Sequence, residues 1–318
     1  MLRAGVDLGG TKIQTVIMAP DNTILGSHRC LTPTDGGPAD VAEAIAGAVR
    51  ASIEDGLVDP LDVTALGLGS PGQIDAAAGT VSNAGNLPGW AAITYPLADD
   101  LFSRLGLPVK LGNDVQVAVR AEAELGAGRG YGSFLGIFAG TGIGGSVVMA
   151  DELWLGRGAA GEIGHMVVAL DGELCPCGRR GCTEAYAGRA AMETTARQWV
   201  AAGRSTALFD IMAAKGRTRL ASGVWAKALS RGDEMAIELI DRAVVALGAA
   251  AGSAVNLLDV EAVIIGGGLG IRLGEEFVER IRIAAMDHIV MPAQPPDFRL
   301  AELGDLGGAM GAALLATP

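Results

Sequence analysis

One plan of strands and glycine loops occurs twice in this chain, about 130 residues apart. Residues 4–30 read as a strand, a turn rich in glycine, a second strand, a polar turn and a third strand. Residues 133–156 follow the same order, and in both segments the first strand ends in a Gly-Thr loop from which the second strand returns. This is a repeat of plan rather than of sequence, and it predicts a duplicated α/β domain.

Helices and buried strands fill the chain around these two segments. Apolar residues at helical spacing over residues 38–57 predict a helix that ends near Gly56. Further helices are predicted over residues 114–126, 185–201, 233–256 and 271–286, and buried strands over residues 63–72, 107–114 and 261–268. The tail, residues 306–316, reads as a helix of small residues that needs a tightly fitting partner.

Composition excludes several classes of protein. Half of the 318 residues are hydrophobic, which is ample for large cores and excludes general disorder. Four cysteines in a chain of this length do not form a disulfide framework. The 24 basic residues against 36 acidic ones give a net charge of −12 without a basic stripe, so we expect no nucleic-acid partner.

No targeting or membrane segment is predicted. The first ten residues, MLRAGVDLGG, lack the apolar core of a signal peptide. Residues 130–150 carry seven glycines, and residues 243–258 are only sixteen long and include Ser253 and Asn256, so neither is interpreted as a membrane span. We therefore expect a cytoplasmic, soluble protein without a membrane partner, in which closely spaced thiols favour a metal over a disulfide.

The glycine loops suit the binding of phosphate. Glycine lets backbone N–H groups approach an anion, and it adopts the positive φ that aligns successive N–H groups on it. The candidate residues are Gly9, Gly10, Thr11 and Lys12 in the first segment, Thr141 and Gly142 in the second, and Gly266, Gly267 and Gly268 further on. The first loop has neither the Walker A nor the dinucleotide pattern, and a structural turn is the alternative for any one loop. Two loops at equivalent places of a duplicated fold favour phosphate binding across a cleft.

Three of the four cysteines and one of the three histidines fall within eighteen residues. His165, Cys175, Cys177 and Cys182 together suit a tetrahedral zinc site. Buried thiols beside an unrelated histidine are the alternative. Four protein ligands leave no open position, so zinc in the loop 165–182 is expected to be structural. Cys30 is interpreted as a small hydrophobic residue on a strand.

Two carboxylates flank the cysteine-rich loop. Glu162 lies three residues before His165, and Glu184 lies two residues after Cys182. Carboxylates bind vicinal hydroxyls well because each accepts two hydrogen bonds. The pattern therefore predicts a polyol pocket that the zinc supports, with two solvated surface glutamates as the alternative.

Asn113 and Asp114 stand where a predicted strand ends and a helix begins, which is where ligands collect in α/β folds. Asp114 can be explained as a helix cap. As a functional residue it would accept the proton of an attacking hydroxyl. Asn86 lies in a Pro-Gly loop, and a role in the turn is equally compatible with the local sequence.

The order of the motifs resembles the ROK family of bacterial sugar kinases and related repressors, and within it the glucokinases. The motifs are DLGGTK at 7–12, GSPG at 69–72, GNLPGW at 85–90, GND at 112–114, GTGIGGS at 140–146, GEIGH at 161–165, CPCGRRGCTE at 175–184, IGGG at 265–268 and LGDLGGAMGAALLA at 303–316. They cover almost the whole chain in the family's order. The combination of GEIGH with the cysteine motif is highly specific.

The resemblance implies an actin-like ATPase (ribonuclease H-like) fold, with two α/β domains around a central cleft. We place the domains at residues 1–113 plus 301–318 and at residues 114–300. The resemblance implies that Asp114 is the catalytic base toward the 6-hydroxyl of glucose. It implies that the sugar is held by Asn86, Asn113, Glu162, His165 and Glu184, with the backbone of Gly72 helping. The phosphates of ATP, accompanied by Mg²⁺, would lie on the glycine loops named above.

Other functions stay open at this point. A kinase of the same family for N-acetylmannosamine, N-acetylglucosamine, fructose or mannose is one alternative, and polyphosphate is an alternative donor. A non-catalytic sugar sensor is a third, which would have no need for Asp114. Because the first of the motifs begins at Asp7, we expect this chain to lack the DNA-binding domain of the related repressors. Because the family commonly forms dimers or tetramers, a homodimer or homotetramer is expected.

Overall fold

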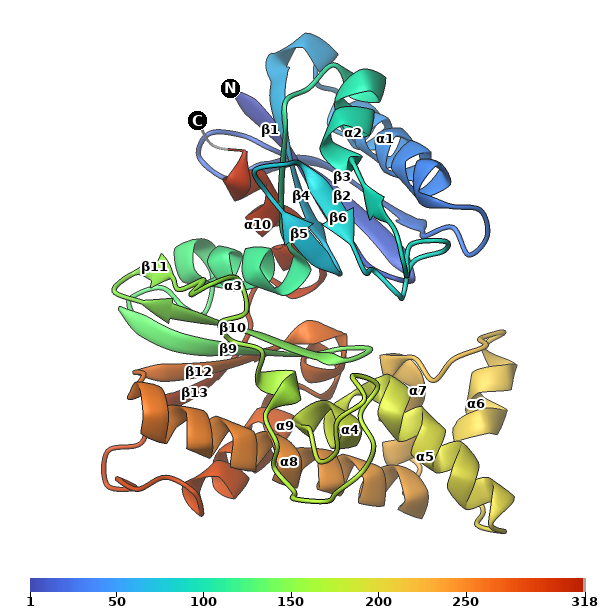
Figure 1. The fold of residues 1–318 in the computed structure, drawn as a ribbon, viewed down its shortest axis with the longest axis vertical. Coiled ribbons are helices and arrows are strands. Elements are labelled where there is room, and N and C mark those ends of the chain that lie inside the picture. The colour runs from blue at the N-terminus through green and yellow to red at the C-terminus, as the bar shows by residue number, and fades with distance from the viewer. Residues whose placement is uncertain (317–318) are drawn as a thin grey trace. The chain divides into compact units, whose positions relative to one another are not determined.

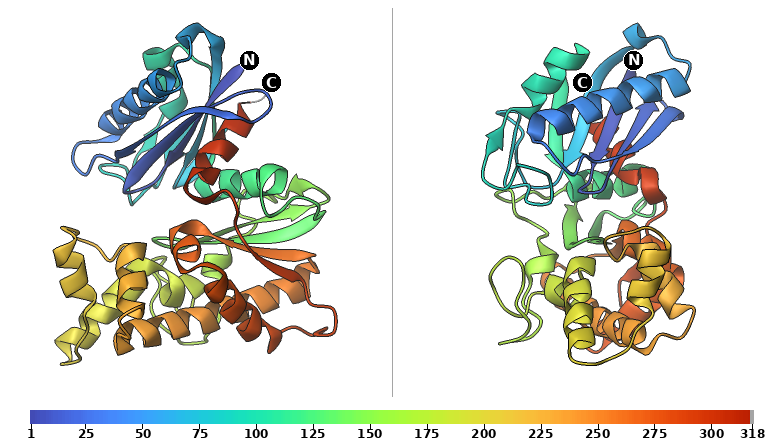
Figure 2. Two further views of the ribbon diagram at one scale, coloured as in Figure 1. Left: turned by 180° about the vertical axis from the view of Figure 1, so that it is seen from behind. Right: turned by 90° about the vertical axis from the view of Figure 1, so that its right-hand side faces the viewer.

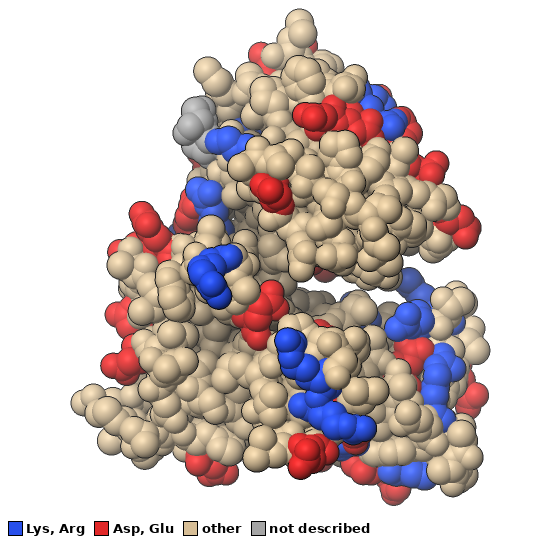
Figure 3. Space-filling model, viewed as in Figure 1, with Lys and Arg blue, Asp and Glu red and all other residues tan. Residues whose placement is uncertain are grey.

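The computed structural model describes residues 1–316, and the chain forms two compact units. The first unit comprises Met1–Gly126 and the chain from Asp305 onward, and the second comprises Ala127–Gly304. Each unit has a five-stranded sheet at its centre and helices packed on it (Figures 1 and 2). On the face shown in Figure 3, acidic and basic side chains are interspersed.

The sheet of the first unit has the strand order β3-β2-β1-β4-β8. Its strands are β1 (Leu2–Leu8), β2 (Lys12–Met18), β3 (Ile24–Leu31), β4 (Val63–Ser70) and β8 (Val109–Asn113). A small antiparallel sheet follows β4 and consists of β5 (Gln73–Asp75), β6 (Thr80–Ser82) and β7 (Thr94–Tyr95). Because β1, β4 and β8 are parallel, the loops after Leu8, Ser70 and Asn113 leave the same edge of the sheet.

Helices pack on both faces of this sheet. They are α1 (Pro38–Asp55), α2 (Leu97–Leu105), α3 (Asp114–Leu125) and α10 (Gly307–Leu315). Side chains alternate along β2, so Ile13 and Ile17 join the core beneath α1, whereas Val16 and Met18 pack against α10. The two faces of the sheet therefore have separate apolar clusters.

The C-terminal helix α10 confirms the predicted tail helix and its need for a close partner. A Cβ added to Gly67 of β4 would lie 1.7 Å from the carbonyl oxygen of Ala312. A Cβ added to Gly311 would lie 1.8 Å from the carbonyl oxygen of Val117 in α3. Glycine at these positions lets the backbones of the sheet, α10 and α3 approach to distances that no side chain would permit.

The second unit repeats the plan of the first. Its sheet has the order β11-β10-β9-β12-β13. The strands are β9 (Ser133–Ala139), β10 (Ile143–Met149), β11 (Glu152–Leu153), β12 (Ala262–Gly266) and β13 (Asp297–Leu300). As β1 does in the first sheet, β9 pairs antiparallel with the next strand and parallel with a later one. The predicted duplication is thereby confirmed.

Six helices of the second unit surround a core that extends from β9, β10 and β12. They are α4 (Thr183–Ala187), α5 (Arg189–Ala201), α6 (Leu208–Ala214), α7 (Ser222–Leu229), α8 (Glu234–Leu258) and α9 (Gly267–Met286). Short 3-10 helices lie at η1 (Pro60–Asp62), η2 (Ile163–His165) and η3 (Gly304–Leu306). The helix predicted over 185–201 is interrupted at Gly188, whose backbone is extended, and α9 contains a non-helical residue at Gly274.

The predicted domain boundary at residues 113 and 114 differs from the division of the structure. Helix α3 packs along α10 and so belongs to the first unit. The chain also returns to the first unit at Asp305 rather than at residue 301. Within residues 1–316, no helix combines the length and the apolar character needed to cross a membrane.

Candidate active site

The first glycine loop joins β1 to β2, and Thr32, the residue after β3, holds it by a hydrogen bond. The backbone N–H of Gly9 donates to the carbonyl of Lys12 at 2.9 Å, and the hydroxyl of Thr32 donates to the carbonyl of Gly9 at 2.6 Å. A Cβ added to Gly10 would lie 3.0 Å from both the side-chain nitrogen and the carbonyl oxygen of Asn86. The structure thus brings the predicted phosphate loop and the predicted sugar residue Asn86 together.

Lys12 is already paired in this structure. Its ammonium group lies 3.0 Å from a carboxylate oxygen of Asp305, and Arg29 lies 3.2 Å from the other oxygen. Thr11, by contrast, is exposed. Asp305 precedes α10, so the ion pair ties the C-terminal segment of the unit to the phosphate loop.

At the end of β8, the helix cap is Asn113 and not Asp114. The side-chain oxygen of Asn113 accepts hydrogen bonds from the backbone N–H groups of Val115 at 3.0 Å and Gln116 at 3.2 Å. Asp114 is the first residue of α3 and is half-buried, and its carboxylate accepts a bond from the N–H of Val115 at 2.9 Å. A role as helix cap therefore does not explain the presence of Asp114.

A second carboxylate, Asp7, lies near Asp114 at the end of β1. Burial and, after it, the negative charge of Asp114 raise the pKa of Asp7 to about 7, while Lys12 opposes the shift. A Cβ added to Gly308, in the first turn of α10, would lie 2.8 Å from the carboxyl carbon of Asp7. Position 308 must therefore be glycine to leave room for the carboxylate. Neighbouring carboxylate oxygens are the ligands that Mg²⁺ prefers.

The Pro-Gly turn after β4 lies at the same sheet edge. Ser70 pairs with Asn113 in the register of β4 and β8, so the turn begins beside the helix cap. Gly72 has φ of +91°, and an added Cβ would lie 2.6 Å from the carbonyl oxygen of Ser82. Glycine is required there, and the backbone of Gly72 stays accessible.

In the second unit, Glu184 holds the second glycine loop. The backbone N–H of Ile143, the residue after the loop, donates to the Oε2 atom of Glu184 at 2.8 Å. A Cβ added to Gly142 would lie 2.1 Å from the same carboxylate oxygen. Gly140 closes the loop by donating to the carbonyl of Gly142 at 2.9 Å, which leaves Thr141 exposed at its tip.

The GEIGH segment reaches the same loop from the other side. Glu162 precedes η2 and is exposed, and His165 is the last residue of η2. A Cβ added to Gly164 would lie 2.0 Å from the carbonyl oxygen of Ile143, so η2 lies directly against the start of β10. Ile143 therefore lies between Glu184 on one side and the segment that carries Glu162 and His165 on the other. These are the three residues predicted to bind sugar in this unit.

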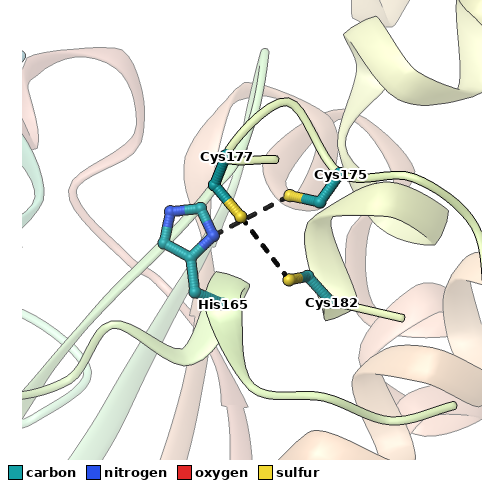
Figure 4. A group of neighbouring side chains, drawn as sticks. All are labelled: His165, Cys175, Cys177 and Cys182. Carbon is teal, nitrogen blue, oxygen red and sulfur yellow. Dashed lines mark hydrogen bonds between the residues drawn. The ribbon is translucent and has the colours of Figure 1, made fainter. Parts of the chain in front are cut away.

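The three thiols and the imidazole of the cysteine-rich loop converge on one point (Figure 4). One ligand atom from each of His165, Cys175, Cys177 and Cys182 lies within 4.8 Å of the others. The sulfurs of Cys177 and Cys182 are 3.7 Å apart, and the sulfur of Cys175 is 3.9 Å from Nδ1 of His165. A disulfide would need about 2.05 Å, whereas the edge of a zinc tetrahedron with sulfur ligands is about 3.8 Å. The donor set fits zinc.

The thiols of the cluster differ in acidity. A hydrogen bond from the backbone N–H of Arg179 lowers the pKa of Cys177 to about 7, whereas burial raises the pKa of Cys175 to about 12. Cys177 is the exposed thiol of the cluster, and a metal binds cysteine as the thiolate. The imidazole presents Nδ1 to the thiols, which leaves Nε2 on the opposite side of the ring.

The third glycine loop is the junction of β12 and α9. Gly267 has φ of +77°, and an added Cβ would lie 2.5 Å from the carbonyl oxygen of Ala139 at the end of β9. A Cβ on Gly266 would lie 2.7 Å from the ring of Phe138. These two glycines are explained by close packing, whereas Gly268 has more open surroundings.

Sequence reasoning missed three polar residues of these loops. Asp7 was inside the DLGGTK motif, and its sequence signal was an acidic residue at the end of a buried strand. Asp305 was inside the tail motif, where nothing local indicates its pairing with Lys12. Arg189 reaches the second loop from α5, 49 residues away in the chain, and no motif marked it.

Two sheets of one plan, each with a glycine loop after its first strand, define the actin-like ATPase fold. The crystal structure of a ROK family glucokinase from Streptomyces griseus in complex with glucose and AMPPNP matches with a TM-score of 0.84, at 33% identity over 99% of each chain. The model of the ROK family matches residues 3–318. The chain belongs to the ROK family.

Relatives within the family act on different sugars. The glucokinase of Thermotoga maritima is 35% identical over 312 residues, which are 97% of this chain and 95% of that protein. The N-acetylgalactosamine kinase AgaK of a Shewanella strain is 32% identical over 323 residues, which are 98% of this chain and 95% of that protein. The chain is a sugar kinase, and its family membership leaves the sugar undetermined.

Proposed function

We propose that this sugar kinase transfers the γ-phosphoryl group of ATP to the 6-hydroxyl of D-glucose, forming glucose 6-phosphate. The observation that carries the proposal is the end of β8, where Asn113 caps α3 and Asp114 is the first helical residue. Asp114 thus supplies a carboxylate at the sheet edge that also bears the loop Gly9–Lys12. The similarity to glucokinases over nearly the whole chain supports glucose as the sugar.

Asp114 would act as general base. Its carboxylate accepts the proton of the 6-hydroxyl, the oxygen attacks the γ-phosphorus in line, and ADP leaves. Because phosphoryl transfer passes through a loose transition state, positioning and charge neutralisation supply most of the rate enhancement. Loss of a general base typically lowers the rate by about 10²–10⁴.

The donor site would use backbone N–H groups of the glycine loops. Gly9, Gly10 and Thr11 in the first unit, and Thr141 and Gly142 in the second, bind phosphate oxygens in this proposal. Lys12 adds a cation, and the junction at Gly266–Gly268 helps to hold the nucleotide. Mg²⁺ neutralises phosphate charge when it is bound, and Asp7 at the end of β1 would hold it.

The residues proposed to bind sugar are described for each unit in turn. Asn113 uses its side-chain oxygen for the helix cap, so its amide nitrogen is the group left to donate to a sugar hydroxyl. Glu184 uses Oε2 for the N–H of Ile143, so Oε1 is the atom left to accept a hydroxyl. Asn86, Glu162, Nε2 of His165 and the backbone of Gly72 would complete the set, while zinc held by His165, Cys175, Cys177 and Cys182 would keep its loop in place.

A panel of sugars tests the proposal. Purified protein with MgATP is assayed for ADP release with glucose, mannose, fructose, N-acetylglucosamine, N-acetylmannosamine and N-acetylgalactosamine, and polyphosphate replaces ATP in a parallel series. We expect the highest kcat/KM with glucose and ATP. A higher value for an N-acetylated hexosamine would assign another sugar, and sugar binding without any ADP release would indicate a sensor.

Replacement of the base gives the second test. Asp114→Asn should lower kcat by about 10²–10⁴. The affinity for glucose, measured by calorimetry, should change little because the amide keeps the size of the side chain. The cap of α3 comes from Asn113, so the melting temperature should also stay close to that of the wild type. Near-normal turnover would reject the assignment of Asp114.

The quaternary structure and location belong to the same proposal. On the resemblance to the family, the enzyme would act in the cytoplasm, in glycolysis and carbohydrate metabolism, as a homodimer or homotetramer. Light scattering of the purified protein measures the assembly directly, and a mass near 32.2 kDa would contradict it.

A further inference from the structure

Arg189 binds the second glycine loop with three hydrogen bonds from one guanidinium group. Its Nε donates to the carbonyl oxygen of Gly140 at 3.1 Å, its Nη2 to the hydroxyl of Thr141 at 3.2 Å, and its Nη1 to the carbonyl oxygen of Leu220 at 3.3 Å. The backbone N–H of Arg189 also donates to Gly140 at 3.3 Å, and that of Ala190 donates to Thr141 at 3.0 Å. The start of α5 is therefore fixed to the loop.

The charge of Arg189 lacks a counter-ion. All three of its side-chain partners are neutral oxygens, and within residues 1–316 no carboxylate forms an ion pair with it. The nearby Glu193 forms ion pairs with Arg197 at 2.7 Å and with Arg219 at 3.2 Å. Burial, and then the charge of Arg219, lower the pKa of Arg189, while the charge of Glu193 opposes the shift.

A cation held in this way is suited to an incoming anion. A guanidinium has five N–H groups, of which three are used here, so two are left to donate. Its position on Thr141, at the exposed tip of the loop, places the charge beside the backbone N–H groups that suit phosphate. Because Glu184 fixes the far end of the loop through Ile143, the cation and the N–H groups are held in one rigid arrangement.

We propose that Arg189 binds the phosphate groups of the donor at the loop 140–142 and holds that loop in its binding conformation. The ligand class is a nucleoside triphosphate or another linear polyphosphate. The inference rests on the proposed function, in which this loop belongs to the donor site. It adds a cation that the glycine motifs do not contain.

The test separates phosphate binding from a purely structural contact. Calorimetry gives the Kd of ATP, adenosine and tripolyphosphate for the wild type, Arg189→Gln and Arg189→Lys. Arg197→Gln is the matched control, since Arg197 lies on the same helix α5 and already pairs with Glu193 at 2.7 Å. We expect Arg189→Gln to weaken ATP and tripolyphosphate binding by about tenfold or more, as for a charged hydrogen bond. Adenosine should bind within twofold of wild type, and Arg189→Lys should recover part of the loss.

The outcomes distinguish this inference from the proposed function. A wild type that binds neither ATP nor tripolyphosphate overturns both. A wild type that binds ATP, with unchanged affinity in Arg189→Gln, overturns only the inference, as does an equal loss for ATP and adenosine. Loss for ATP without loss for tripolyphosphate would also count against a contact with phosphate.

A crystal structure of the wild type with AMPPNP makes the test independent of how the variants fold. We expect a phosphate oxygen within about 3.2 Å of the Arg189 guanidinium. A bound nucleotide whose phosphates lie beyond hydrogen-bond distance from it would overturn the inference.

Discussion

Among single residues, the carboxylates of the first unit show how surroundings divide similar groups into different roles. Asp7 is half-buried near Asp114, and its pKa rises to about 7. Burial also acts on Asp305, but there the hydrogen bond and charge of Lys12 prevail and its pKa is lowered. Asp305 therefore stays ionised as a partner of Lys12, whereas Asp7 changes charge near neutral pH. A divalent cation would restore the ionised form of Asp7.

Asp7 should make the stability of the metal-free protein depend on pH. Its pKa is about 7 in the folded state against an ordinary 3.8, so the folded state binds more protons between these values and stability falls as pH rises through that window. Asp7→Asn should remove this loss. Its free energy of unfolding should exceed that of the wild type at pH 8, by about 1 kcal/mol or more, and match it near pH 4.

Urea unfolding at pH 4 and pH 8 in the presence of EDTA measures this effect. The control is Asp21→Asn, because Asp21 is exposed and its pKa is lowered by the N–H of Thr23. That variant should show no gain at pH 8. If Asp7→Asn changes stability equally at both pH values, the ionisation of Asp7 is not the cause.

At the scale of elements, α10 shows how a helix of small residues can be specific. Gly311 meets the backbone of α3, and Gly67 of β4 meets the backbone of α10. The attraction comes from close packing over the helix rather than from large side chains. At the start of α10, Asp305 pairs with Lys12 and Gly308 lies against Asp7. The position of α10 therefore also fixes the first phosphate loop.

A side chain at position 311 should therefore push α10 away from α3 and destabilise the packing between them. A Cβ would lie 1.8 Å from the carbonyl oxygen of Val117, so Gly311→Val should lower the free energy of unfolding. We expect a loss of about 3 kcal/mol or more, as for overpacking of a rigid core. The control is Gly47→Ala, because an added Cβ at that α1 position has no neighbour within 4 Å. That variant should gain about 0.5–1 kcal/mol from helix propensity. Equal effects of the two substitutions in urea unfolding would contradict the packing argument.

Elements with a strong local pattern could be predicted from the sequence. The apolar strands β1 and β9, the glycine turns that follow them and the helical spacing in α1 and α8 are local properties, and both sheets have the predicted plan. Short elements such as α6 and the strand pair β5–β6 have too few residues to show a period. The break between α4 and α5 was missed because no local pattern marks Gly188, which lies against the second glycine loop: an added Cβ would be 3.4 Å from the Cα of Gly142.

The candidate site shows the same division between local and distant causes. The cysteine cluster was visible because its ligands are rare residues at short spacing, and the structure brings all four together. The sequence, by contrast, does not show that Asn113 rather than Asp114 caps α3, because either residue type can adopt the cap geometry. The contact of Glu184 with Ile143 joins residues 41 apart, and no sequence period reports it.

For the whole molecule, two separate cores mean that a local change can act on one unit alone. The first core lies around β1, β2 and α1, and the second around β9, α8 and α9. Every proposed zinc ligand lies in the second unit. A structural zinc would therefore stabilise that unit, and two-state unfolding of the whole chain is not expected.

Removal of the metal should loosen the second glycine loop, because a chain of contacts connects the cysteine cluster to that loop. Cys182 is the residue before α4, Glu184 in α4 accepts the N–H of Ile143, and η2 lies on the same residue through Gly164. Chelation, or Cys177→Ser, should reduce zinc content and raise amide exchange over residues 140–145 as well as over the cysteine loop. The affinities for both glucose and ATP should fall. Cys30→Ser is the control, since Cys30 lies on β3 in the first unit. Unchanged exchange at 140–145 in a zinc-free protein would show that the cluster supports only its own loop.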